Sequence, residues 1–276
     1  MNGKRAVKAV VRGGLVVLLL SGSLWAGSEL TKVRLRTRVE AFKGSGQWQA
    51  VEYEYELPVR QTALIICDMW DKHWCRGASA RVEGLVLKAQ PLLDRARRNG
   101  VLIIHAPSGT MEFYRDAPQR KAILAIPRVA PPAPLVVSEA PLPVDASDGG
   151  CDTPPDQPYT AWTRQHPGIR IGAEDLISDN GEEVYSALRA RGLDHLLILG
   201  VHTNMCILNR SFAIRQMTRW GVRTILIRDL TDAMYDSQDA PWVGHAQGTE
   251  LVIQHIEKYW CPTVLSADLA RALARR

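Results

Sequence analysis

From residue 61 onward, uninterrupted apolar runs alternate with segments whose apolar positions recur every three or four residues. The apolar runs predict strands that are covered on both faces. They lie at 62–70, 101–107, 195–201 and 222–230. The segments with helical spacing lie at 80–100, 181–192, 205–221 and 244–260. Because strands alternate with helices, we expect right-handed crossovers and an α/β fold with an open, mainly parallel sheet between two layers of helices.

Two further segments carry strand signals. Residues 31–57 alternate polar and apolar positions around a "KGSG" break, which predicts a β-hairpin extension that joins the main domain. Residues 159–165, "YTAWTRQ", form a short strand candidate after a Pro-rich stretch at 127–158. That stretch is expected either to be an insertion over the mouth of the ligand site or to be a solvated loop.

The N-terminal segment has the order of a secretory signal. Residues 1–26 begin with four basic residues, continue into the apolar run "LVVLLL" and end in small residues, so cleavage is expected after Ala26. The apolar run is short for a membrane anchor, which is the alternative. We therefore divide the chain into a signal peptide at 1–26, a β extension at 27–60 and a main domain at 61–276, and we expect the mature protein in the periplasm or outside the cell.

Charge points to a small-molecule partner. Loss of the four basic residues of the signal takes the formal net charge from +5 to +1. The remaining chain has no basic stripe with interleaved aromatic residues and no zinc-finger spacing, so nothing indicates nucleic acid. The phosphate-binding motifs GxGxxG and GxxxxGK[ST] do not follow the predicted strands, and we expect no cofactor.

The carboxyl ends of the predicted strands carry chemically active side chains. Open α/β sheets bind ligands at this edge, near the switch in strand order. The side chains expected there are Asp68, His105, Arg164, the segment 201–206 and Asp229 to Asp232. Cys206 stands at the predicted start of a helix, where free backbone N–H groups favour a thiolate and can hold an oxyanion.

Asp68 is the expected proton acceptor for Cys206. On composition alone, the residues favour the alternative, a buried structural cysteine and an aspartate that caps the next helix. The chain has five cysteines and no CxxC spacing, so an oxidising compartment would leave at least one thiol unpaired. The pairing of the others stays open.

The segments "ALIICDMWDKHWC", "VLIIHAP" and "LLILGVHTNMCILNRSFAIRQMTRWG" resemble the isochorismatase-like cysteine hydrolases, which include nicotinamidases and N-carbamoylsarcosine amidase. The resemblance covers about residues 61–260, and the turn "GVHTNMC" is its most specific part. It implies a Rossmann-like fold and an Asp–Lys–Cys triad that hydrolyses C–N bonds through a thioester. Asp68 and Cys206 match two members of that triad. It also implies a cis bond between Val201 and His202, and an oxyanion hole formed by the amides of His202 and Cys206.

The triad lysine has no counterpart in the segment where the resemblance implies it. Arg164 stands at the nearest position, and Gln165 or His166 would take that place after a shift in register. Arginine can hold a carboxylate and keep positive charge near a thiol, but it does not exchange a proton at neutral pH. Arg164 is therefore expected to position Asp68 and Cys206.

Aromatic and histidine side chains near the first strand are candidates for substrate binding. Trp70, His73, Trp74 and His105 could line a flat cavity for a planar amide, and core packing is the alternative. Nicotinamidases also bind a divalent metal, but the Asp-x-His motif after the second strand is missing here. We expect no metal; the alternative set is Asp71, His73 and His105.

The sequence thus predicts an exported cysteine hydrolase that cleaves a small amide or related C–N bond. Two alternatives stay open: a small-molecule binding protein on the same fold, and a thiol-independent vinyl-ether hydrolase that needs Asp68 and not Cys206. No membrane contact is expected after cleavage of the signal. A homo-oligomer is expected because members of the family often form one.

Overall fold

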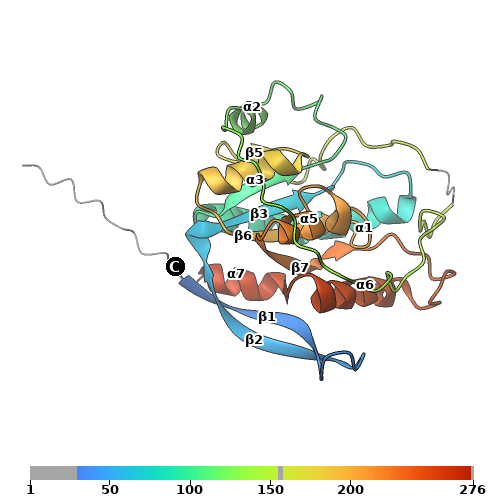
Figure 1. Ribbon diagram of the computed structural model, residues 1–276. Coiled ribbons are helices and arrows are strands. Elements are labelled where there is room, and N and C mark those ends of the chain that lie inside the picture. The colour runs from blue at the N-terminus through green and yellow to red at the C-terminus, as the bar shows by residue number, and fades with distance from the viewer. Residues whose placement is uncertain (1–29, 155–157, 275–276) are drawn as a thin grey trace, which may run out of the picture.

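The computed structural model describes residues 30–154 and 158–274, and it places one eight-stranded sheet at the centre of the molecule (Figure 1). The predicted signal peptide lies outside these residues. The strand order is β2-β1-β8-β7-β6-β3-β4-β5. The six strands from β8 to β5 are parallel, which confirms the predicted open, mainly parallel sheet.

The parallel strands are short and buried on both faces, as their continuous apolar runs predict. They are β3 (Thr62–Cys67), β4 (Leu102–Ala106), β5 (Leu176–Ile177), β6 (His195–Val201), β7 (Arg223–Asp232) and β8 (Thr263–Val264). From β3 the chain builds outward to β4 and β5, and then returns to build β6, β7 and β8 on the other side. The strand order therefore switches between β3 and β6, where this class of sheet binds its ligands.

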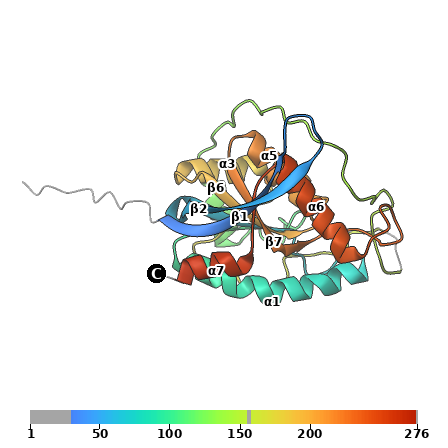
Figure 2. The same ribbon diagram turned by 90° about the horizontal axis from the view of Figure 1, so that it is seen from below.

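Helices cover both faces of the sheet (Figure 2). One face packs against α1 (Arg76–Arg98) and α7 (Ser266–Ala274). The other face packs against the remaining helices, which are α2 (Pro118–Leu124), α3 (Gly181–Ala190), α4 (Cys206–Asn209), α5 (Ile214–Arg219) and α6 (His245–Tyr259). Within the described ranges, none of these helices is both long and apolar enough to cross a membrane.

The predicted N-terminal hairpin is confirmed. Strands β1 (Leu30–Glu40) and β2 (Trp48–Pro58) pair in antiparallel register along their whole length, and a one-turn 3-10 helix, η1 (Val59–Gln61), leads into β3. β1 also pairs with β8, so the hairpin extends the sheet beyond its last parallel strand. Val33 and Leu35 of β1 are buried, and the hairpin shares the apolar core beneath α1 and α7.

A buried ion pair attaches the hairpin to α6. The Glu257 side chain is inaccessible to solvent, and its Oε1 accepts hydrogen bonds from Arg36 Nε at 2.7 Å and Thr263 Oγ1 at 2.6 Å. Arg36 also contacts Glu250 at 2.8 Å. A carboxylate buried this deeply needs its partners, so the position of β1 depends on this contact.

Two predicted elements differ from the structure. Residues 159–165 form no strand, apart from a single bridge between Trp70 and Gln165, and the edge strand is instead β5. The predicted helix at 205–221 is broken into α4 and α5, because Arg210 takes an extended conformation with ψ 148°. A hydrogen bond to the start of α3 holds the chain at this break, with Ser211 Oγ accepting from Gly181 N at 2.9 Å.

The described part of the Pro-rich stretch, residues 127–154, has no regular secondary structure and is attached covalently near the start of α1. A disulfide joins Cys75 to Cys151, which leaves Cys67, Cys206 and Cys261 as free thiols. Arg81 of α1 also contacts Asp152, with 2.6 Å between Nη1 and Oδ2. The end of the Pro-rich stretch is therefore held beside the carboxyl edge of the sheet.

We expect Glu257→Gln to lower the free energy of unfolding by about 3 kcal/mol, because it removes the buried counter-ion of Arg36, which keeps only the partly exposed Glu250. Glu54→Gln is the matched control, since it breaks the exposed hairpin pair between Lys32 and Glu54 and should have no measurable effect. Urea unfolding of the two variants measures both values. Equal effects would show that the buried pair does not hold the hairpin.

Candidate active site

The switch point brings the ends of β3 and β6 into contact. Gly200 stands one residue before the end of β6 with φ 119°, and a Cβ on it would lie 1.9 Å from the carbonyl oxygen of Cys67. Only glycine fits this close approach. It allows the residues that follow β6 to reach Asp68, the residue that follows β3.

Asp68 is fully buried and held by two hydrogen bonds. Its Oδ1 accepts one from Ser108 N at 2.7 Å, and its Oδ2 accepts one from Arg210 Nε at 2.8 Å. The thiol of Cys206 lies beside this carboxyl group, and each group shifts the pKa of the other. The backbone of Asp68 has φ 49°, an uncommon value for a residue with a side chain, and such values gather at functional sites.

The turn between β6 and α4 is clamped to the end of β7. The Asn204 side chain accepts from Met234 N at 2.9 Å and donates to Met234 O at 2.7 Å. Thr203 N donates to Asp232 O at 2.8 Å. The Val201–His202 peptide bond is cis, and the backbone N–H of His202 faces the sulfur of Cys206. The turn therefore holds the thiol beside both a carboxylate and a backbone donor.

Burial decides the protonation of this pair. It raises the pKa of Cys206 to about 12, with a further contribution from the negative charge of Asp68. Burial also raises the pKa of Asp68, although Arg210 opposes it. The expected lowering of the thiol pKa by a helix start is wrong, because α4 spans only one turn and desolvation dominates. The resting site pairs a neutral thiol with a carboxylate of increased basicity.

The structure places Arg210, and not Arg164, against Asp68. The Arg164 side chain is exposed, and its guanidinium carbon lies 5.5 Å from the ring centre of Phe113. Asp71 fixes the loop that carries it, by accepting from Thr163 N at 2.9 Å and Arg164 N at 3.3 Å. Arg164 therefore lies on the surface of this loop and not in the site.

The other two positions considered for the lysine are also engaged elsewhere. Gln165 Oε1 lies 2.9 Å from His105 Nδ1, and His166 Nε2 lies 2.9 Å from Glu83 Oε1. Ser178, the residue that follows β5, is hydrogen-bonded to Glu183. The cation of the site comes instead from Arg210, one helical turn after Cys206, and this spacing is the sequence signal that could have found it.

Three of the predicted aromatic positions lie around the site. Trp70 and His73 line a small cavity together with Asp68 and His202, and the exposed Lys72 lies at the same cavity. The cavity measures about 10 Å³, enough for roughly one water molecule. Trp74 lies one step away, with its ring 5.2 Å from His73, and packs near the Cys75–Cys151 disulfide.

Trp162 belongs to the same group of aromatic rings, and the sequence analysis did not identify it. Its ring stacks on Trp70 with 4.3 Å between the ring centres and 13° between the planes. It reaches this place from the loop after the Pro-rich stretch, 92 positions along the chain from Trp70. Stacked indoles of this kind suit a planar partner.

His105 does not line the cavity. It is fully buried, and both ring nitrogens are engaged, Nδ1 with Gln165 and Nε2 with Asp175 Oδ2 at 2.8 Å. Arg97 also contacts Asp175 at 2.7 Å. The expected substrate contact of His105 is therefore corrected to a structural link between β4 and the loop that precedes β5.

The alternative metal set is not assembled. Asp71 accepts from the loop at 163–164, His73 Nδ1 accepts from Cys75 N at 3.1 Å, and His105 is committed to Gln165 and Asp175. Over the described ranges, the clustered candidate ligands are Cys75, Cys151 and Asp152. The two cysteines are joined in a disulfide, so this cluster does not fit a metal ion.

His202 has an unusual environment. Its ring is buried, its Nε2 has no hydrogen-bond partner, and burial lowers its pKa to about 3. The ring of His73 lies edge-on at 4.8 Å, and burial lowers the pKa of that residue to about 4. Both imidazoles are therefore neutral at physiological pH, and they form an uncharged wall beside the Asp68 carboxylate.

The fold matches known hydrolase structures. The chain is similar to a cysteine hydrolase from Pseudomonas syringae pv. phaseolicola, with a TM-score of 0.52 and 19% identity over 79% of this chain and 95% of that chain. It is also similar to an isochorismatase from Pseudomonas putida, with a TM-score of 0.47 and 16% identity over 76% and 90% of the two chains. No family model and no curated protein matches the sequence. The first likeness confirms the expected α/β fold of a cysteine hydrolase.

The charges around Cys206 predict how its reactivity responds to mutation. We expect Asp68→Asn to increase the rate of iodoacetamide labelling of Cys206 at pH 9 by about tenfold, because it removes a negative charge that raises the thiol pKa. Arg210→Met should decrease the rate, because Arg210 lowers that pKa. Peptide mass spectrometry measures both rates.

Cys206→Ser is the control for labelling of the two other free thiols, which are buried. Circular dichroism checks that each variant is folded, since Arg210→Met leaves a buried carboxylate without its cation. Equal labelling rates in the wild type and in both variants would contradict the proposed electrostatic coupling.

Proposed function

We propose that this chain is an exported cysteine hydrolase that cleaves a small amide or related C–N bond through a thioester on Cys206. The observation that carries the proposal is the juxtaposition of the Cys206 thiol and the buried Asp68 carboxylate at the switch point of the sheet. The fold shared with a cysteine hydrolase supports it.

In the first step, the Cys206 sulfur attacks the substrate carbonyl carbon while its proton moves to Asp68. The C–N bond then breaks, and the leaving amine takes that proton. A buried carboxylate with a raised pKa suits both transfers, because it accepts a proton readily and holds it until the amine departs. The proton never needs to leave the site between the two transfers.

The tetrahedral intermediate carries a negative oxygen that needs donors. The backbone N–H of His202, which faces the Cys206 sulfur, and that of Cys206 itself are the proposed donors. In the second step, Asp68 removes a proton from water, and the resulting hydroxide attacks the thioester carbonyl. The carbon–sulfur bond breaks and the acid product leaves. The Cys206 thiolate then takes back the proton that Asp68 received from water.

Arg210 takes the place of the missing lysine in this scheme. It holds Oδ2 of Asp68 at 2.8 Å and keeps a positive charge near the thiol. Arginine remains protonated throughout, so it stabilises the anionic stages and does not transfer the proton. Asp68 is then the group that exchanges protons with substrate.

The walls of the site favour a small planar substrate. Trp70 and His73 provide flat apolar surfaces, and the neutral His202 adds no charge. The cavity of about 10 Å³ holds roughly one water molecule, so a substrate has to displace lining side chains such as His73.

The proposed export to the periplasm or the exterior rests on two features. The segment at 1–26 has the order of a signal peptide, and the Cys75–Cys151 disulfide suits an oxidising compartment. Expressed with this segment in a bacterial host, the protein should appear in the periplasmic fraction with an intact mass that begins at Gly27. Recovery of the full-length mass from the cytoplasm would contradict export.

A second candidate is thiol-independent vinyl-ether hydrolysis, with Asp68 as the acid. The raised pKa of Cys206 favours this reading, because a neutral thiol is a weak nucleophile. The raised pKa of Asp68 would also help it to donate a proton.

Three variants separate these functions. For an amide substrate found by screening for released amine, we expect Cys206→Ser and Asp68→Asn each to lower kcat/KM by at least about 10³-fold. Arg210→Lys should lower it by a smaller factor, because it keeps the charge and loses the fork geometry. Incubation with substrate should also add the acyl mass to Cys206 in the wild type.

Arg164→Gln is the matched control, since this exposed arginine lies outside the site and its loss should leave turnover unchanged. Full activity in Cys206→Ser with loss in Asp68→Asn would identify the vinyl-ether reaction. Binding without turnover in the wild type would identify a binding protein and overturn both proposals.

A further inference from the structure

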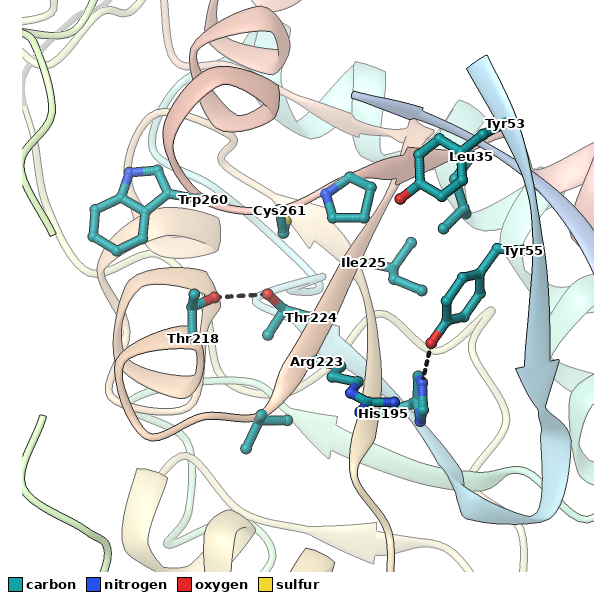
Figure 3. A pocket seen from close by; sticks show the side chains of 12 residues that line it. Leu35, Tyr53, Tyr55, His195, Thr218, Arg223, Thr224, Ile225, Trp260 and Cys261 are labelled. Carbon is teal, nitrogen blue, oxygen red and sulfur yellow. Dashed lines mark hydrogen bonds between the residues drawn. The ribbon is translucent and has the colours of Figure 1, made fainter. Parts of the chain in front are cut away.

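A second cavity lies at the opposite edge of the sheet from Cys206 (Figure 3). It measures about 360 Å³, within the range of small-molecule sites. Its floor is formed where β6, β7 and β8 begin, at His195, Arg223 and Pro262, and its outer wall is the hairpin strand β2 with Tyr53 and Tyr55.

One end of the cavity carries a chain of hydrogen bonds. Asp194 Oδ1 lies 2.5 Å from His195 Nδ1, and His195 Nε2 lies 2.6 Å from the hydroxyl of Tyr55. A carboxylate only accepts, so Nδ1 carries the proton of a neutral imidazole. Burial lowers the pKa of His195, which keeps the ring neutral. Nε2 is then an acceptor, and Tyr55 donates its only hydroxyl hydrogen to it.

The direction of these hydrogen bonds determines which ligand groups the cavity can bind. With its hydrogen committed to His195, the Tyr55 oxygen can only accept a hydrogen bond from a ligand. The guanidinium of Arg223 lies at the same end and is largely exposed, so it can donate. A hydroxyl group satisfies both, because it donates to Tyr55 and accepts from Arg223.

The rest of the cavity is largely apolar, and the hydroxyls of its two threonines are already paired. The hydroxyls of Thr218 and Thr224 bond each other at 2.7 Å, and Thr224 also bonds the buried Cys261 thiol. Leu35, Ile225 and the ring of Tyr53 supply apolar surface, as Figure 3 shows. This surface fits a flat hydrocarbon body more than a polar one.

We propose that this cavity is a binding site for a small phenol, with the aromatic body between Tyr53 and Ile225 and the hydroxyl at Tyr55 and Arg223. The site is separate from Asp68 and Cys206 and does not depend on the proposed hydrolysis. Its construction requires the hairpin, since β2 supplies both tyrosines.

The test compares 4-ethylphenol with 4-ethylanisole, a methyl ether of similar shape that cannot donate. Isothermal titration of the full chain should show the phenol binding at least about tenfold more tightly, the worth of one hydrogen bond. In Tyr55→Phe this preference should disappear while the anisole affinity stays the same. Ile225→Phe, which fills the cavity, should weaken both ligands.

Val51→Ala is the matched control, because Val51 is an exposed residue of the same strand outside the cavity lining, and it should change neither affinity. Circular dichroism and thermal melting confirm that each variant is folded. If Tyr55→Phe does not fold, the ligand pair on the wild type and Ile225→Phe still decide the question.

Any of the following outcomes would overturn the proposal. One is no binding of the phenol to the wild type at millimolar concentration. Another is equal affinity for both ligands, or an affinity that Ile225→Phe leaves unchanged. The third is a dimer in sedimentation that Ile225→Phe dissociates, which would show that this cavity is a contact surface between two copies of the chain.

Discussion

The burial of one carboxylate organises the catalytic edge of this protein. Asp68 has no access to solvent, and a charge in that position is stable only when it is paired and hydrogen-bonded. The Ser108 amide follows β4 and the Arg210 guanidinium follows β6; both supply hydrogen bonds, and the Cys206 thiol lies beside the carboxylate after β6. Gly200 follows from the same requirement, because a larger residue would keep β6 too far from β3 for its turn to reach Asp68.

The same burial fixes how the site can react. Removal of solvent disfavours both anions, so thiol and carboxylate hold their protons more tightly than they would in water. A free thiolate waiting for substrate is therefore not the resting state. In the proposed reaction, the sulfur becomes nucleophilic as its proton passes to Asp68, and Arg210 stabilises the negative charge in every stage. A lysine in this place could also transfer its own proton, whereas the proposed reaction uses the carboxylate alone.

The sequence was sufficient for the fold and for the two central residues, and insufficient for their surroundings. Asp68 and Cys206 follow strongly apolar strands, so the parallel-sheet rule places them together. Arg164 was misplaced because "YTAWTRQ" has strand composition, whereas the real edge strand β5 has two residues and is too short to show any period. The contact between Arg210 and Asp68 spans 142 positions. His105 depends in the same way on Gln165 and Asp175, whose positions only the folded chain defines.

The N-terminal hairpin adds a second constraint at the other end of the sheet. Strand β8 has only two residues and would be a weak edge, and β1 covers it while the buried Glu257 holds β1 in place. The hairpin stands away from the starts of β6 and β7 far enough to enclose a cavity instead of closing the gap with side chains. Tyr55 must satisfy its hydroxyl there, and His195 with Asp194 provides the acceptor. The hairpin that covers the sheet edge thus also encloses an apolar cavity with hydrogen-bonded polar groups at one end. Covering the edge does not by itself require such a cavity.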